Sequence, residues 1–282
     1  MERLDLVVGE YTFSARAGGP PDGELVLLLH GFPETSYEWR HQIPALADAG
    51  LRAVAPDQRG YASGARPEPV DAYTIDQLAA DALGFADALG VDRFHLVGHD
   101  WGGAVAWYVA GHHGHRLRTL TVVSTPHLVP FAQSIAEGEQ REKSAYMLAF
   151  RDPGAEAMFL ADDAALLRSL YEGSGLADPD AVAEYLRVFG EPGTPGQPSA
   201  LTGGLNWYRA TDFRVSMGPV TTPTLYVWGT DDIALGREAA EATAAHVDGP
   251  YRFEELDGVS HWVPEEVPDR LNALLLEHIQ RR

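Results

Sequence analysis

The sequence contains no cysteine among its 282 residues. This absence excludes disulfide bonds, a thiolate nucleophile and cysteine-ligated zinc. Histidine is the remaining strong metal ligand, and His112, His113 and His115 lie close together in the chain. No pattern of carboxylate or cysteine partners accompanies these three histidines, so we predict no metal site.

Basic residues are also scarce, with 21 Lys and Arg against 41 Asp and Glu and a formal net charge of −20. Such a chain would be repelled by a phosphate backbone or an anionic membrane, so we expect neither as a partner. No stretch approaches the roughly 18 consecutive apolar residues of a membrane span. The N-terminus has no basic start followed by an apolar run, which excludes a secretory signal peptide. By the absence of such signals we expect a cytoplasmic location.

In its other residues the chain has the ordinary composition of a globular protein, with 45% hydrophobic and 22% charged residues. Five consecutive aliphatic residues, 25–29, predict a strand that is buried on both faces of a parallel sheet. A helix is expected over residues 36–49. Another is expected over residues 75–89, where Thr74 and Gln77 have the spacing of a capping box.

Strand and helix patterns alternate from about residue 25 to 126, and again from residue 222 to the end. This alternation predicts an α/β fold with a mostly parallel central sheet and helices on both faces. The intervening segment has helical patterns and no convincing strand, and we interpret it as an inserted helical cap. The predicted domains are a core of residues 1–127 and 216–282 and a cap of residues 128–215. Within the cap, helices are expected over residues 142–150, 155–159, 164–171 and 180–189, followed by a hinge loop over residues 190–199.

The strongest local signal is Gly98-His99-Asp100-Trp101-Gly102, which lies between a predicted strand and a predicted helix. Two glycines around a central residue permit the strained turn that lifts a nucleophile above the sheet. The central residue is Asp100, whose carboxylate is ionised at neutral pH and can attack an electrophilic carbon to form an ester. A helix N-cap aspartate after a glycine turn is the alternative interpretation.

A second motif, His30-Gly31-Phe32-Pro33, follows the buried strand over residues 25–29. In the α/β-hydrolase arrangement the loop at this place supplies one backbone N–H of an oxyanion hole, and the residue after the nucleophile supplies the other. We assign these two donors to Phe32 and Trp101. An ordinary turn at the end of a strand would also explain the motif.

The remaining triad candidates follow two later strands. Asp231 and Asp232 come after the strand that ends near Trp228, and His261 comes after the strand over residues 251–255. The order nucleophile, acid, histidine is that of α/β-hydrolases. Proteins with this fold place the acid three residues after the glycine, which favours Asp232 over Asp231. The histidine would then activate water to hydrolyse the ester at Asp100.

At these positions the sequence resembles the epoxide hydrolases of the α/β-hydrolase superfamily, and the resemblance covers nearly the whole chain. It implies hydrolysis of an epoxide to a vicinal diol, without a cofactor. It also implies that two cap tyrosines assist ring opening, in positions matched by Tyr208 and less closely by Tyr146. We further expect His30, Pro33, Trp207 and Trp262 to contact the substrate. The matching stretches are His30-Gly31-Phe32-Pro33-Glu34, Asp57-Gln58-Arg59-Gly60-Tyr61, Gly98-His99-Asp100-Trp101-Gly102-Gly103, Asn206-Trp207-Tyr208-Arg209 and His261-Trp262.

Two other functions fit part of this pattern. A haloalkane dehalogenase has the same Asp-Trp pair, but it needs a second halide donor, which the side chain of Phe32 cannot supply. Trp207 is the single tryptophan of the cap that could do so. A non-catalytic member that keeps only the fold would show a broken set of catalytic residues. Every required position is filled here, so we favour the epoxide hydrolase, with a small-molecule substrate and water as partners and a homodimer as a possible assembly.

Overall fold

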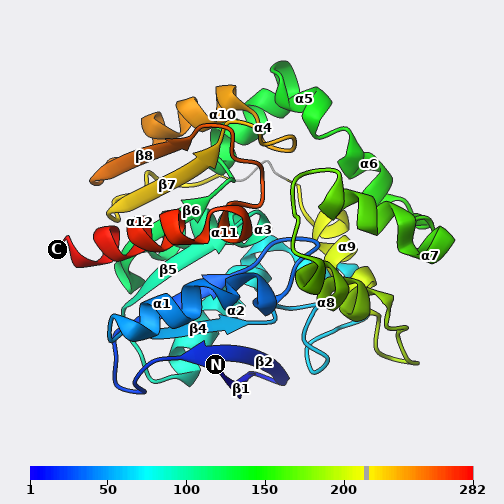
Figure 1. Cartoon of the computed structure of the whole chain (residues 1–282), viewed down its shortest axis with the longest axis horizontal. Coiled ribbons are helices and arrows are strands. Elements are labelled where there is room, and N and C mark those ends of the chain that lie inside the picture. The colour runs from blue at the N-terminus through cyan, green and yellow to red at the C-terminus, as the bar shows by residue number, and fades with distance from the viewer. Residues whose placement is uncertain (213–215, 282) are drawn as a thin grey trace.

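A computed structural model describes residues 1–212 and 216–281 and shows one eight-stranded sheet in the order β1-β2-β4-β3-β5-β6-β7-β8 (Figure 1). Among these eight strands β2 alone runs against the others, since it pairs antiparallel with both β1 and β4. The mostly parallel sheet is therefore confirmed. The strands are β1 (Glu2–Val8), β2 (Tyr11–Gly18), β3 (Leu25–Leu29), β4 (Arg52–Pro56), β5 (Phe94–His99), β6 (Leu117–Val123), β7 (Thr224–Gly229) and β8 (Tyr251–Leu256).

Helices cover both faces of the sheet, as the alternating pattern predicted (Figure 1). The helices α1 (Gln42–Asp48) and α12 (Pro268–Gln280) pack apolar residues on one face. The helices α2 (Ile75–Ala88) and α3 (Trp101–His113) do so on the other. The remaining core helices are η1 (Ser36–Arg40), η2 (Val70–Tyr73), η3 (Gly114–Arg116), α10 (Arg237–Ala242), η4 (Thr243–His246) and α11 (Val263–Glu266).

The helix expected over residues 36–49 is two helices, η1 and α1, which meet at His41. The reason is Pro44, which has no N–H to give to the carbonyl of residue 40 and whose ring would clash with that carbonyl in a continuous helix. A new helix that begins at Gln42 places the proline in its first turn, where it is tolerated. The prediction of a capping box at α2 was also wrong in part, since Thr74 is the N-cap residue but its side chain makes no capping hydrogen bond.

Between β6 and β7 the described residues form six helices, and α6 to α9 gather beside one end of the sheet (Figure 1). The predicted break between helices near residue 160 is present, because Asp162, Asp163 and Ala164 within α7 have positive φ. Two of the six, α4 and α9, were not predicted. The predicted domain boundary at residue 215 lies outside the described residues. The inserted helices are α4 (Leu128–Glu137), α5 (Gln140–Lys143), α6 (Tyr146–Arg151), α7 (Ala155–Glu172), α8 (Pro179–Gly190) and α9 (Ala200–Ala210).

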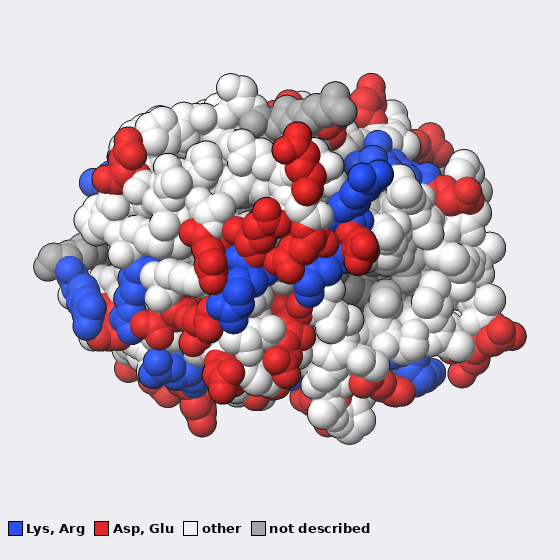
Figure 2. Space-filling view, turned by 90° about the horizontal axis from the view of Figure 1, so that it is seen from above, with Lys and Arg blue, Asp and Glu red and all other residues white. Residues whose placement is uncertain are grey.

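Charged side chains of both signs lie next to one another on the face shown in Figure 2. Ion pairs are also present between elements, since Arg252 of β8 is paired with Glu254 of the same strand and with Glu277 of α12. Part of the acidic residues are therefore neutralised locally by arginine, and the net negative charge comes from the others. Among the helices of the described ranges, none combines the length and the apolar character that crossing a membrane requires.

A buried ion pair joins the inserted helices to the core. Arg40 of η1 contacts Glu265 of α11 at 2.8 Å and Asp178, the N-cap residue of α8, at 2.7 Å. The side chains of Arg40 and Glu265 are only 8% and 1% exposed, and the hydroxyl of Tyr185 also hydrogen-bonds to Glu265. These contacts tie α8 to the core beside the carboxyl ends of the strands.

Replacing Arg40 by methionine should lower the free energy of unfolding by about 3 kcal/mol, because the charge of Glu265 would remain buried without its partner. Urea unfolding would measure the loss. Arg187→Met is the matched control, since the Arg187 side chain is 58% exposed and its pair with Glu191 should contribute little. Equal stabilities of the two variants would contradict the prediction.

Candidate active site

Asp100 occupies a strained turn between β5 and α3, with φ 48° and ψ −118°. A Cβ at Gly98 would lie 2.2 Å from the carbonyl oxygen of Gly102, and one at Gly102 would lie 2.1 Å from that of Leu29. Both positions therefore require glycine. The Asp100 side chain makes no capping hydrogen bond to α3, although the residue stands at the N-cap. A local capping role thus does not account for this aspartate.

The Asp100 carboxylate instead points to groups from other elements. Its Oδ1 accepts a hydrogen bond of 2.9 Å from the backbone N–H of Phe32, and its Oδ2 lies 3.6 Å from Nε2 of His261. Gly31 allows this close approach, because a Cβ there would be 2.4 Å from Cβ of Asp100. Trp101 is the first residue of α3 and follows the carboxylate directly.

The structure brings Asp100, Asp232 and His261 together. His261 Nδ1 lies 2.8 Å from Oδ2 of Asp232, whose other oxygen accepts the backbone N–H groups of Ala234 and Leu235 at 2.8 and 2.9 Å. Of the two adjacent acids, Asp232 is buried and reaches the histidine, whereas Asp231 is exposed. The ring of His261 is thus oriented between two carboxylates.

These contacts set the charges at rest. Burial alone would raise the pKa of Asp100, but the hydrogen bond and charge of His261 lower it below its usual value. Burial alone would likewise lower the pKa of His261, but the charge of Asp232 and the contact with Asp100 raise it well above its usual value. At neutral pH the resting site therefore holds an ionised Asp100 beside a protonated His261.

Two tyrosines from the inserted helices face the nucleophile. Tyr146 of α6 and Tyr208 of α9 line the same cavity as Asp100, with ring centroids 6.5 Å apart. Tyr208 packs edge-on against Trp101 and Phe32, with centroid separations of 5.0 and 5.5 Å. Burial raises the pKa of both phenols, and the charge of Asp100 raises them further. Both hydroxyls therefore keep their protons and can donate them.

The main cavity has a volume of about 160 Å³ and an apolar wall with few polar groups. A second cavity of about 20 Å³ lies on the other flank of the nucleophile and shares Asp100, Tyr146 and Tyr208 with it. Neither has a lysine or arginine in its wall within the described residues. The main cavity is lined by Phe32, Pro33, Asp100, Tyr146, Phe150, Leu170, Ser174, Tyr208, Ile233, Ala234, His261 and Trp262.

Four residues were expected to contact substrate, and the structure divides them. Pro33 and Trp262 line the main cavity, and the indole N–H of Trp262 donates to Ser174 Oγ at 2.6 Å. His30 and Trp207 line neither cavity. His30 is fully buried and accepts the backbone N–H of Gln58 at 3.2 Å, and burial lowers its pKa to about 4.

Trp207 is likewise held behind the cavity wall, since its indole N–H donates to the carbonyl of Arg59 at 2.8 Å.

The sequence analysis did not predict several residues of the cavity wall. Phe150, Leu170, Ser174 and Ile233 belong to no motif, and their place in the wall follows from how distant segments pack. No local signal in the sequence marks them.

Comparisons with known proteins identify the family of the chain. A family model described as alpha/beta hydrolase fold matches residues 24–268. The chain is 36% identical to Epoxide hydrolase A of Mycobacterium tuberculosis, over 93% of this chain and 92% of that protein. It is 35% identical to Epoxide hydrolase 4 of Mus musculus, over 92% of this chain and 74% of that protein.

Solved structures extend the likeness to three dimensions. The crystal structure of Epoxide Hydrolase A from Mycobacterium thermoresistibile matches with a TM-score of 0.85 and 30% identity, over 99% of this chain and 98% of that one. An epoxide hydrolase from metagenomes of hot environments matches with a TM-score of 0.88 and 32% identity, over 100% and 99% of the two chains. The chain is a hydrolase that belongs to the α/β-hydrolase fold family, and the four relatives described above are epoxide hydrolases.

Proposed function

We propose that the protein hydrolyses an epoxide to a vicinal diol through a covalent ester on Asp100. The observation that carries the proposal is an ionised carboxylate that shares one apolar cavity with two protonated phenols and a histidine. An ionised carboxylate can open a strained ring without prior activation, which a serine at this turn could not do. The names of the relatives point to the same class of substrate.

In the first step, Tyr146 and Tyr208 hydrogen-bond to the epoxide oxygen. Asp100 Oδ2 attacks one ring carbon from the opposite side, the bond from that carbon to the epoxide oxygen breaks, and a tyrosine supplies a proton to the new alkoxide. The hydrogen bond from the N–H of Phe32 holds Oδ1 and so aims the other oxygen at the cavity. The product of this step is a hydroxyalkyl ester on Asp100.

In the second step, His261 removes a proton from water, which attacks the ester carbonyl. The histidine can act as a base because the ester has lost the negative charge that Asp100 contributed, so the pKa of His261 falls from its raised resting value. The N–H groups of Phe32 and Trp101 stabilise the oxyanion. The bond between the acyl carbon and the alkyl oxygen then breaks as the His261 imidazolium protonates that oxygen, and the diol leaves. The new carboxylic acid of Asp100, which keeps one oxygen from water, returns its proton to His261, and the tyrosinate of the first step has already recovered its proton from the resting imidazolium.

Haloalkane dehalogenation is less well supported by the site. The indole N–H of Trp207 is already bonded to the carbonyl of Arg59, and Trp207 lies outside both cavities. The side chain of Trp101 is hydrogen-bonded to Tyr208, so a halide would have to compete with this phenol for the indole N–H. The two phenols serve an alkoxide leaving group better than a halide, which needs no proton.

The direct test is the conversion of styrene oxide to its diol, with Asp100→Ala as control and a parallel halide-release assay on 1-bromobutane. Diol formation by the unaltered protein alone supports the proposal. A single turnover in H₂¹⁸O should leave the heavy isotope in Asp100, because water attacks the acyl carbon. Halide release without diol would move the assignment to a dehalogenase.

The unequal cavities predict a preference among epoxides. A phenyl group fits a space of about 160 Å³, whereas a space of about 20 Å³ holds little more than a water molecule. We expect good turnover of styrene oxide and poor turnover of trans-stilbene oxide. Phe131→Ala, which enlarges the small cavity, should raise the stilbene oxide to styrene oxide ratio of kcat/KM by roughly tenfold.

Leu170→Ala is the matched control, because it enlarges the main cavity and leaves the small one unchanged. It should not raise the same ratio. Efficient turnover of trans-stilbene oxide by the unaltered protein would show that the two cavities do not limit the two substituents separately.

A further inference from the structure

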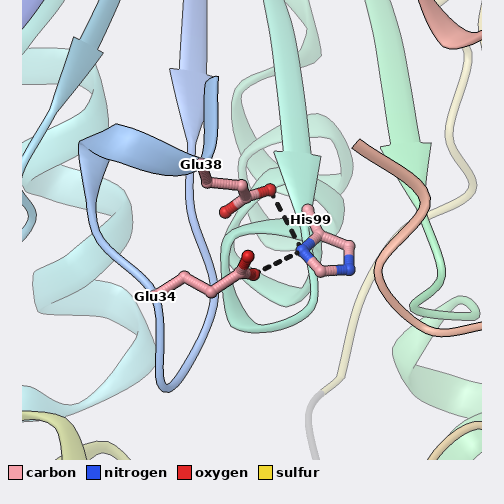
Figure 3. Close-up of side chains that lie close together, drawn as sticks. All are labelled: Glu34, Glu38 and His99. Atoms are coloured by element: carbon pink, nitrogen blue, oxygen red, sulfur yellow. Dashed lines mark hydrogen bonds and ion pairs between the residues drawn. The ribbon is translucent and has the colours of Figure 1, made fainter. Parts of the chain in front are cut away.

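The proposed triad is supported by side chains that the two reaction steps do not use. Behind the histidine, His99 Nε2 lies 2.9 Å from the carbonyl oxygen of His261, and His99 Nδ1 faces Glu34 and Glu38 (Figure 3). These residues come from the core. The support of Asp232 is different, because it comes from the inserted helix α5.

The carboxylate of Asp232 is aimed by the turn that follows it. Its Oδ1 accepts the N–H groups of Ala234 and Leu235, and its Oδ2 faces Nδ1 of His261. The direction of the carboxylate therefore depends on how the peptide groups of residues 232–236 are oriented. The same turn forms part of both cavity walls, since Ala234 lines the main cavity and Leu235 lines the small one.

Gln140 of α5 is fully buried and bonds to this turn at two points. Its Nε2 donates to the carbonyl of Ala234 at 2.6 Å, and its Oε1 accepts the N–H of Gly236 at 2.8 Å. The second N–H of the amide donates to Ser144 Oγ at 2.8 Å. Both hydrogens of the amide thus have acceptors, and neither a carboxylate nor an apolar side chain could make the same set of bonds.

Lys143, the single lysine of the sequence, is the last residue of α5 and reaches the acid itself. The residue is half-buried, and its Nζ donates to the backbone carbonyl of Asp232 at 2.7 Å. A hydrogen bond from a charged donor is stronger than one between neutral groups. This contact therefore restrains the backbone of the residue whose side chain orients His261.

The start of α5 also fits closely against the residues that follow the turn. A Cβ on Gly236 would lie 2.4 Å from Oε1 of Glu139, and this oxygen accepts the N–H of Glu238 at 2.8 Å. In return, Oε2 of Glu238 accepts the N–H of Glu139 at 3.1 Å. Hydrogen bonds thus join residues 139–143 to residues 232–238 at both ends of the segment.

We propose that Gln140 and Lys143 are positioning residues for the triad acid and hold its carboxylate in the place from which it orients His261. Tyr146 lies three residues beyond Lys143, at the start of α6, and lines the cavity. One short inserted segment therefore holds the acid that serves ester hydrolysis and leads into a phenol that serves ring opening. This inference rests on the proposed function.

Losing either contact should slow the second step and spare the first. Ester formation uses Asp100 and the phenols, and Tyr146 keeps its packing against Phe150, with ring centroids 4.9 Å apart. In single turnovers, ester hydrolysis should fall about tenfold in Gln140→Met and in Lys143→Met, because a small displacement of a catalytic group is costly. Ester formation should change by less than about twofold. Lys143→Arg keeps a charged N–H donor and should recover most of the loss.

Arg141→Met is the matched control, because it removes a positive charge from an exposed position of the same helix. It should leave both steps unchanged. Equal losses in the two steps for Gln140→Met and Lys143→Met would mean that α5 supports the structure in general, and would overturn the proposal. Full ester hydrolysis in both variants would overturn it as well.

A second measurement needs no substrate and so separates this proposal from the assignment of the reaction. The proton between His261 Nδ1 and Asp232 Oδ2, which are 2.8 Å apart, should give a far-downfield ¹H NMR signal that is absent in His261→Gln. We expect the signal to broaden or move upfield in Gln140→Met and Lys143→Met, and to stay in place in Arg141→Met. An unchanged signal in the first two variants would overturn the proposal even if epoxide hydrolysis is confirmed.

Lys143 also offers a test that requires no variant to fold. Because it is the single lysine, reductive methylation with formaldehyde and a borohydride modifies this side chain and the N-terminal amine alone. In the folded protein Lys143 should react roughly tenfold or more slowly than in protein unfolded by guanidinium chloride, since its Nζ is held by the carbonyl of Asp232. Equal rates would show that the amine is free and would overturn the proposal.

Discussion

Replacing His261 by glutamine should stop the reaction after its first step and leave the substrate attached to Asp100. The amide preserves much of the shape of the side chain but cannot accept the proton of water, so ester hydrolysis should fall by about 10³-fold or more. Ester formation should survive at neutral and higher pH, because the backbone N–H of Phe32 still stabilises the carboxylate of Asp100 when the contribution of His261 is lost. Intact-protein mass after mixing with styrene oxide should increase by the mass of one epoxide.

Peptide mapping should place this added mass on Asp100. The double variant Asp100→Ala/His261→Gln is the control and should show no adduct, which separates ester formation from random alkylation of surface carboxylates by a reactive epoxide. Multiple turnovers by His261→Gln, or an adduct on another residue, would contradict the two-step assignment.

The nucleophile turn was the most predictable part of the site, because its constraints are local. Gly98 and Gly102 are fixed by backbone atoms that would collide with any Cβ, so the sequence pattern and the geometry have one cause. The choice between Asp231 and Asp232 was less secure from sequence. In the structure it follows from a tight turn in which the N–H groups of Ala234 and Leu235 hold the second carboxylate toward His261.

The inserted helices were less predictable because tertiary contacts override their local preferences. Helix α9 contains Gly203 and Gly204, which are poor helix formers. Both are required by close packing, since a Cβ on Gly203 would lie 2.2 Å from the carbonyl oxygen of Gly60. Such packing brings Tyr208 over Asp100, and nothing within the sequence of α9 indicates it. The contact between His99 and Glu38 could not be predicted from the sequence either, because it depends on how η1 and the end of β5 meet.

Replacing both tyrosines of the cavity by phenylalanine should nearly abolish ester formation. The epoxide oxygen leaves as an alkoxide, and without a donor it would acquire its charge in an apolar space. Either phenol can still donate when the other is absent, so Tyr146→Phe and Tyr208→Phe should each slow ester formation by about 10 to 10²-fold. The double variant should lose about 10⁴-fold.

The two tyrosines can be separated from the rest of the site by measuring both steps. Rapid-mixing experiments that follow tryptophan fluorescence, to which Trp101 beside Tyr208 contributes, would report ester formation, and chemical quench would report hydrolysis. Tyr226→Phe is the matched control, because Tyr226 is also fully buried but its hydroxyl donates to the carbonyl of Ser124 within the core. We expect the loss only in ester formation, since the alkoxide is already protonated when water attacks. A loss confined to hydrolysis would mean that the phenols orient water and that another group protonates the epoxide oxygen.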